Sequence, residues 1–410
     1  NMRRKTLALL CVVIAWGFLM VPDTLASGMG KHSFVPDIPD TWVQIYPDDV
    51  DPAFQYNGLT PGCAACPGCN GQFSFFVKGG KTNNLVIYFQ GGGACWHSMN
   101  CLYVHTYYEE VPPLSSFSDT QGKGIFDTKN PANPFRDWYF VYIPYCTGDV
   151  HWGARDVAYP DYLDRIPGFD SWTIRHRGFV NFQLVMEWVT QRFRMPFKIF
   201  VTGSSAGGYG AAMAFPYVRE AFPHSQVYML ADAANGVVGD QFKNASIYNW
   251  DIQIPRWIPG FEDGYTPDME VSDVFLNIAR YYPDSKLAQF TTAWDNNQAF
   301  FYNVMLNIYD PSAWNNIFPV WCDWHARMLG YAHDTAYGAR NYRYYIAEGE
   351  YHTILMSPRF YTEDSAGVSF AKWVKMMVEN PLNRHGGPPG GMWRNVECAD
   401  CPNPYGLTCP

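Results

Sequence analysis

Residues 198–218 read KIFVTGSSAGGYGAAMAFPYV. Within this stretch, positions 203–207 form the pattern Gly-x-Ser-x-Gly, centred on Ser205. The apolar run before the pattern predicts a strand, and the small residues after it predict a helix. A sharp strand-to-helix turn of this kind holds a serine hydroxyl clear of the sheet, and its glycines leave room for neighbouring backbone. The stretch therefore predicts a nucleophile elbow; the alternative is a glycine-rich turn that only packs closely.

The rest of the chain predicts an α/β fold, with a mostly parallel sheet and helices on both faces, because short β-branched and aromatic runs alternate with helical patterns. Residues 84–89 (NLVIYF) are apolar on both faces, which is typical of a central strand. Residues 179–194 carry apolar side chains at helical spacing without Gly or Pro. The other expected elements are strands at 41–46, 72–77, 139–143, 198–202, 227–231 and 343–347, and a helix at 206–221 that is kinked or broken at Pro216.

Two segments depart from this alternation. Residues 236–290 are rich in Trp, Tyr, Pro and Asp and show little strand pattern, which predicts an insertion near the active site. It is either a cap or lid or a helical excursion with no role in binding. Residues 381–410 predict an irregular, disulfide-linked tail. With no repeat or linker in between, we expect 28–410 to form a single catalytic domain.

The N-terminal residues 1–27 predict a secretory signal peptide. A basic cluster precedes an apolar run at 6–21, and small residues follow it. That run is short for a membrane span of about 20 residues. We therefore expect a protein secreted to an extracellular or periplasmic space, with no stable membrane insertion.

Cysteine usage agrees with export. Of eleven cysteines, Cys11 lies in the predicted signal peptide, and ten remain. An even number in an exported chain favours disulfides over a zinc site, although Cys63-x-x-Cys66-x-x-Cys69 and Cys398-x-x-Cys401 have zinc-like spacing. We expect Cys95 to pair with Cys101, and the 63–69 cluster to pair with the C-terminal cysteines.

The charge of the chain argues against a nucleic-acid partner. The formal net charge is −9, and loss of 1–27, with three basic residues and one acidic residue, makes it −11. The sequence has no basic stripe. An anionic surface gives no long-range attraction to a polyanionic substrate either. We expect a monomer.

A glycine run at 91–93 follows the expected central strand at 84–89. Glycines at this place let backbone N–H groups approach a substrate carbonyl. We assign the N–H groups of Gly92, Gly93 and Ala206 to an oxyanion hole, where each donor is worth about 3–4 kcal/mol at the transition state. A plain flexible turn is the alternative.

The base is expected late in the chain, after the last strand. His352 follows the expected strand at 343–347 through the turn Glu348-Gly349-Glu350-Tyr351. His325 and His333 precede that strand, and His385 lies in a Gly/Pro-rich tail. His352 is therefore the predicted general base.

The spacing of residues along the chain does not decide which carboxylate orients the histidine. Asp232 follows the expected strand at 227–231, and Asp295 follows the segment 236–290. Either carboxylate can approach a histidine from one of two neighbouring strands. Asp323 and Asp334 are weaker candidates.

Four motifs together resemble the pectin acetylesterase/Notum family of serine carboxylesterases, with bacterial members as the nearest likeness. They are GGGACW with Cys101, FVYIPYCTGDVHWG at 140–153, GSSAGGYGA, and GEYHT around His352, in order within about 70–370. The resemblance implies an α/β-hydrolase fold, Ser205 as nucleophile, His352 as base, Gly92, Gly93 and Ala206 as oxyanion donors, and no cofactor or metal. It also favours Asp295 over Asp232 as the acid.

The family removes acetyl groups from pectin or a fatty acyl group from a signalling protein. This chain has Gly92-Gly93-Ala94 where plant members and Notum carry Gly-Gly-Trp, so neither substrate transfers directly. We expect an acylated carbohydrate or a small ester as the substrate. The expected reaction is hydrolysis of O-acyl esters, above all O-acetyl esters on a plant cell-wall polysaccharide such as pectin. The alternatives are a lipase-like, general carboxylesterase or polyester hydrolase activity on longer acyl esters, and a catalytically inactive carbohydrate-binding protein.

Overall fold

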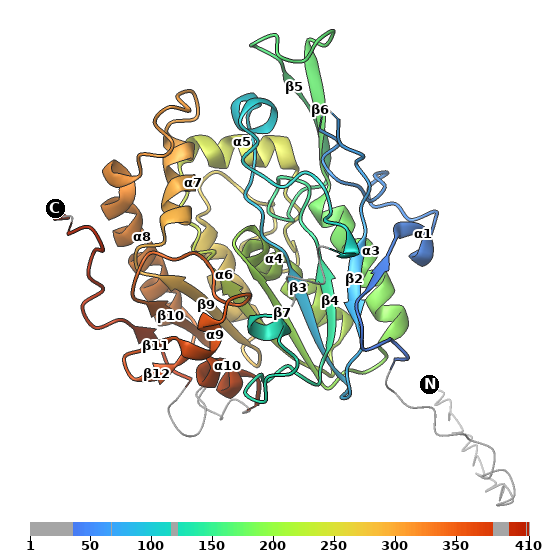
Figure 1. The fold of residues 1–410 in the computed structure, drawn as a ribbon, viewed down its shortest axis with the longest axis vertical. Helices are drawn as coiled ribbons and strands as arrows, with labels where there is room; N and C mark the ends of the chain where they lie inside the picture. The colour runs from blue at the N-terminus through green and yellow to red at the C-terminus, as the bar shows by residue number, and fades with distance from the viewer. Residues whose placement is uncertain (1–35, 67, 116–121, 380–392, 407, 410) are drawn as a thin grey trace, which may run out of the picture. The chain divides into compact units, whose positions relative to one another are not determined.

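A mostly parallel sheet forms the centre of the fold, in the strand order β1-β2-β4-β3-β7-β8-β9-β10-β13 (Figure 1). This computed structural model describes residues 36–66, 68–115, 122–379, 393–406 and 408–409, so the predicted signal peptide lies outside the described residues. Parallel pairing runs from β4 through β3 and on to β13, whereas β2 pairs antiparallel with both β1 and β4. The α/β fold predicted from the sequence is confirmed.

Seven of the nine sheet strands in the described part of the chain overlap the expected runs, and β9 and β13 were not expected. The sheet strands are β1 (Val43–Ile45), β2 (Phe75–Lys78), β3 (Asn84–Phe89), β4 (Tyr139–Ile143), β7 (Lys198–Ser204), β8 (Gln226–Asp232), β9 (Lys286–Thr292), β10 (Tyr342–Ala347) and β13 (Val396–Glu397). A separate hairpin consists of β5 (Arg155–Pro160) and β6 (Ser171–His176), and a short pair consists of β11 (Asp364–Ser365) and β12 (Val368–Ser369).

The central strands bury side chains on both faces of the sheet. In β3, Leu85, Ile87 and Phe89 pack into one apolar cluster, while Val86 and Tyr88 pack into a second. Successive side chains of a strand point to opposite faces, so a strand covered on both sides needs an uninterrupted apolar run.

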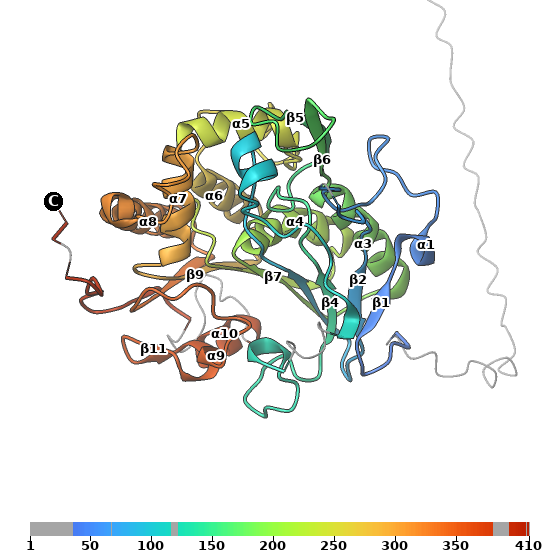
Figure 2. The ribbon, with the colours of Figure 1, turned by 45° about the horizontal axis from the view of Figure 1, so that its top comes forward.

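Helices cover the two faces unequally. In Figure 2, α3, α4, α6, α7 and α8 lie on one side of the sheet, and α9 and α10 lie on the other. The helices are α1 (Pro47–Val50), α3 (Gly178–Arg192), α4 (Ala206–Ala221), α5 (Asp240–Trp250), α6 (Val271–Tyr281), α7 (Asn296–Leu306), α8 (Phe318–Gly338), α9 (Arg359–Thr362) and α10 (Phe370–Glu379). None of the helices within the described ranges combines the length and apolar character needed to span a bilayer.

The structure excludes a break at Pro216 and places the end of the expected insertion in a strand of the sheet. Helix α4 continues without a break through Pro216. The expected insertion at 236–290 runs into β9, a fully buried strand that pairs with β8 and β10. β9 reads KLAQFTT, and its polar side chains interrupt the apolar pattern that predicts a buried strand. These side chains can be buried because they form hydrogen bonds inside the fold: Gln289 donates to the Ala234 carbonyl, and Thr292 donates to the Tyr351 carbonyl.

All ten cysteines after Cys11 form disulfides, and Cys95 pairs with Cys101 as expected. The expected link between the 63–69 cluster and the C-terminal cysteines is wrong. The pairs are Cys63–Cys146, Cys66–Cys69, Cys95–Cys101, Cys322–Cys409 and Cys398–Cys401. The tail is therefore held to α8 through Cys322, and its residues 381–392 lie outside the described part of the chain.

Candidate active site

Ser205 lies at the turn between β7 and α4, in a backbone conformation that side chains rarely adopt. Its φ is +57° and its ψ is −127°. Such a conformation is typically unfavourable by about 1–3 kcal/mol and persists only where the surroundings enforce it. Here the Ser205 N–H donates to the Asp232 carbonyl at 2.7 Å. A Cβ at Gly203 would lie 2.2 Å from the Gly207 carbonyl oxygen, and a Cβ at Gly207 would lie 2.0 Å from that of Phe89. The glycines of the motif are therefore required by close backbone packing.

Asp295 and His352 form a buried pair. His352 Nδ1 lies 2.9 Å from Asp295 Oδ1 and 2.8 Å from Oδ2. The carboxylate is fully buried and also caps α7, where Oδ1 accepts from the N–H groups of Asn297 and Gln298. The Gln298 side chain donates to Oδ2 at 3.0 Å. These donors hold the carboxylate in one orientation toward the imidazole.

His352 lines the same pocket as Ser205. Nε2 is buried and has no hydrogen-bond partner among the described residues. Burial lowers the pKa of His352, but the charge of Asp295, its hydrogen bond and the charge of Asp232 together raise that pKa above 6.5. One ring nitrogen is thus paired with a carboxylate, and the other has no hydrogen-bond partner among the described residues.

Asp232 has different neighbours. Its carboxylate accepts from the Ser204 hydroxyl at 2.6 Å and from the backbone N–H groups of Ile354 and Leu355. Ser204 in turn accepts from the Tyr88 hydroxyl at 2.9 Å. Burial raises the pKa of Asp232 to about 6. Asp232 therefore ties the chain after His352 to the strand end beneath Ser205.

The glycine loop after β3 lies beside Ser205. Gly93, with φ +79°, and Ala206 both line the pocket, whereas Gly92 is not among the lining residues. A Cβ at Gly92 would lie within 3 Å of the rings of Tyr145 and Tyr108. Ala206 is the first residue of α4, where backbone N–H groups lack partners within the helix. The arrangement brings backbone donors from two segments to the same cavity.

His151 supports this loop and was not assigned a role from the sequence. Its Nε2 donates to the carbonyl of Gln90 at 2.9 Å, and burial lowers its pKa to about 4, so the ring is neutral. Val150 and His151 have φ values of +50° and +66°. Asp149 Oδ1 accepts from the N–H of His151. The only signal in the sequence was the stretch GDVHWG within a motif already singled out.

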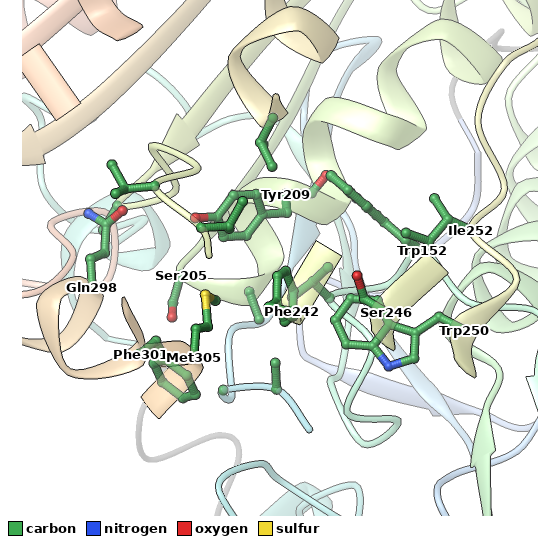
Figure 3. Close-up of a pocket in the computed structure, with 18 of the residues that line it drawn as sticks. Trp152, Ser205, Tyr209, Phe242, Ser246, Trp250, Ile252, Gln298, Phe301 and Met305 are labelled. Carbon is green, nitrogen blue, oxygen red and sulfur yellow. The ribbon is translucent and has the colours of Figure 1, made fainter. Parts of the chain in front are cut away.

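The pocket is narrow and mainly apolar. Its volume is about 70 Å³. Figure 3 shows Ser205 toward one side of the labelled residues and Trp152, Trp250 and Ile252 toward the other. Helix α5 and the segment after it contribute Phe242, Ser246, Trp250, Ile252, Tyr265 and Val271, so the segment expected as an insertion forms walls of this pocket.

The remaining candidates lie elsewhere. His325 stacks on Trp294 and contacts the Ala293 carbonyl through Nδ1. His333 pairs with Glu397. Asp323 accepts from Tyr302 and Arg327, and Asp334 is exposed. His385 lies outside the described residues.

Comparisons with known proteins agree with this fold. A family model described as Pectinacetylesterase matches residues 62–249. Palmitoleoyl-protein carboxylesterase NOTUM of Schmidtea mediterranea is 27% identical over 146 residues, covering 34% of this chain and 25% of the relative. The Mus musculus protein of that name is 26% identical over 185 residues, covering 42% of this chain and 34% of the relative. The matches thus span only about a quarter to a third of the length of these relatives.

A solved structure of the Wnt deacylase Notum from Drosophila matches with a TM-score of 0.53 at 16% identity, covering 80% of this chain and 95% of that chain. At this identity the likeness shows the fold alone. The family model, the two relatives and the shared fold all make this chain similar to the pectin acetylesterase/Notum family.

Proposed function

We propose that the chain is a secreted serine carboxylesterase that removes short O-acyl groups, chiefly acetyl, from a plant cell-wall polysaccharide such as pectin. The observation that carries the proposal is the Asp295–His352 pair, whose imidazole lines the same pocket as Ser205 and whose Nε2 has no hydrogen-bond partner among the described residues. Five disulfides support export, because such bonds persist in oxidising compartments.

The reaction proceeds in two steps. His352 Nε2 takes the proton of the Ser205 hydroxyl as Oγ attacks the acyl carbonyl, and the same proton passes to the departing alcohol oxygen. The N–H groups of Gly92, Gly93 and Ala206 stabilise the negative charge on the carbonyl oxygen. Water, deprotonated by His352, then attacks the acyl-enzyme; the acid leaves, and Ser205 regains its proton. Asp295 keeps Nδ1 protonated and stabilises the imidazolium.

The size of the pocket favours a short acyl group. An engineered cavity of about 150 Å³ binds benzene, which has six heavy atoms. By that scale, the 70 Å³ of this pocket suits a group of about three heavy atoms. An acetyl group has three. The apolar walls suit its methyl group and give no partner to a charged one.

A second candidate is hydrolysis of longer acyl esters, including lipid esters or polyesters. The apolar lining from Phe242, Phe301 and Met305 favours it, and so do relatives named as palmitoleoyl-protein carboxylesterases. It requires the pocket to open well beyond its volume in this structure.

Nitrophenyl esters of graded chain length separate the two candidates. We expect the highest kcat/KM with the acetyl ester and a fall beyond the butyryl ester; a maximum at eight carbons or more would favour the second candidate. Ser205→Ala should lower kcat at least about 10⁴-fold, with an unchanged Tm. Ser204→Ala is the matched control, because that hydroxyl points to Asp232 instead. Substantial turnover in Ser205→Ala would refute the proposal.

A further inference from the structure

A second cavity of about 330 Å³ opens beside the active-site pocket. Its walls come from the loop around Trp96, the β5–β6 hairpin and the C-terminal end of α5. Figures 1 and 2 both show the hairpin extending from the fold close to α5. The volume falls within the range of about 300–1,000 Å³ that ligand sites occupy.

The two cavities share one wall. Asn249 and Trp96 line the second cavity, while the neighbouring residues Trp250 and Ala94 line the active-site pocket. Asn249 donates to the Trp96 carbonyl at 2.8 Å, and the Trp250 indole donates to the Cys95 carbonyl at 3.0 Å. A chain that occupies the second cavity is therefore held close to the nucleophile's pocket.

Exposed aromatic rings surround this cavity. Tyr162 and Tyr248 line it and are 67% and 69% exposed. The imidazole of His97 stacks on Tyr162 and meets Tyr309, itself 75% exposed, edge-on at 5.0 Å. Rings left in water at the rim of a polar cavity are a common sign of a binding surface. Tyrosine rings suit sugars because they offer an apolar face together with a hydroxyl.

The cavity is lined by one basic residue, Arg155, and one acidic residue, Asp156, in a chain of net charge −9. Asp156 pairs with Arg177. The Arg155 guanidinium lies 4.9 Å from the centre of the Tyr248 ring and donates to the Tyr248 carbonyl. Asp156 is thus paired, whereas Arg155 forms no ion pair among the described residues and is held against one of the exposed rings.

We propose that this cavity is a subsite for an acidic polysaccharide chain, in which sugar rings stack on Tyr162 and Tyr248 and a uronate carboxylate binds Arg155. The proposal rests on the proposed function and adds the substrate class. The negative net charge of the chain gives no long-range attraction to an acidic substrate, but Arg155 is a local cation that the carboxylate can bind. A guanidinium is well suited to a carboxylate because its planar donors match the two oxygens.

The test compares a polymer with a small ester. We expect Tyr162→Ala and Tyr248→Ala each to raise KM for acetylated galacturonan roughly fivefold to tenfold more than KM for nitrophenyl acetate. Arg155→Gln should raise KM for galacturonan about tenfold and KM for neutral acetylated xylan less than twofold. Tyr337→Ala is the matched control, because Tyr337 is 96% exposed and lines neither cavity.

Two results would overturn this proposal. One is a galacturonan KM within twofold of the parent in both tyrosine variants. The other is an equal effect of Arg155→Gln on galacturonan and on xylan. Calorimetry with an oligogalacturonide on Ser205→Ala tests the subsite without turnover, and we expect Tyr248→Ala in that background to weaken binding at least fivefold. If the parent protein does not hydrolyse nitrophenyl acetate, the proposed esterase activity is refuted. The proposed subsite is tested separately, because the binding measurement does not require turnover.

Discussion

Asp232 and Asp295 lie at the carboxyl ends of neighbouring parallel strands but contact different groups. Asp232 is the last residue of β8, whereas Asp295 follows β9 and caps α7, and both are fully buried. Asp295 contacts the His352 imidazole. Asp232 instead binds the backbone two and three residues after His352, together with the Ser204 hydroxyl.

The difference shows that one histidine is held in two ways. Asp295 acts on the ring, where its charge raises the pKa of His352 and fixes which nitrogen carries a proton. Asp232 acts on the loop, where it fixes the position of the backbone that carries the ring. We therefore expect loss of Asp295 to affect chemistry most, and loss of Asp232 to affect stability most.

The largest expected effect follows Asp295→Asn. The amide keeps the shape of the side chain, but it no longer holds Nδ1–H or stabilises the imidazolium, so kcat should fall about 10³- to 10⁴-fold. Nitrophenyl acetate kinetics measure this loss. Asp232→Asn, assayed in parallel, should lower kcat less than tenfold. A larger loss at Asp232 would reverse the two assignments.

Asp232→Asn should act on folding instead. The carboxylate accepts from three groups, whereas the asparagine NH₂ faces these donors without an acceptor, which lowers the free energy of unfolding by about 1–3 kcal/mol. Because burial raises the pKa of Asp232 to about 6, the parent is stabilised below pH 4 and loses that stabilisation as the pH rises through about 6. The parent–variant difference in thermal unfolding should therefore shrink from pH 4 to pH 7. A difference that grows over this range would contradict the assignment.

The pH profile gives a smaller, more specific contrast. His352 must be neutral to accept the serine proton, so kcat/KM should fall as the pH drops through its pKa, which lies above 6.5. In Asp295→Asn the acid limb of the residual activity should move to lower pH, because burial still lowers the pKa and the charge that opposed it is gone. An unmoved limb would mean that another group titrates there.

Ser204→Ala should have the smallest effect. It removes one donor to Asp232 and the acceptor for Tyr88, which is worth about 1 kcal/mol of unfolding free energy. We expect kcat to stay within about threefold of the parent. A loss comparable to that of Asp295→Asn would indicate that the network behind the elbow takes part in catalysis.

Local pattern was enough to predict the elements that carry the site. The run at 84–89 and the motif around Ser205 are short-range signals, since an apolar strand, a tight turn and a small-residue helix depend on neighbouring residues. The position of His352 after the last predicted strand was read in the same way. β9 was missed because its Gln and Thr side chains are satisfied only by contacts inside the folded protein.

Sequence alone determined the α/β class, the sharp strand-to-helix turn at Ser205 and the histidine after β10, because each leaves a periodic or motif-like trace along the chain. Tertiary structure decided the rest. It selected Asp295 over Asp232 as the neighbour of His352, paired Cys63 with Cys146, and brought Arg155 against Tyr248. These contacts join residues dozens of positions apart. Their distances are set by how the strands and helices pack, and the spacing of residues along the chain does not encode them.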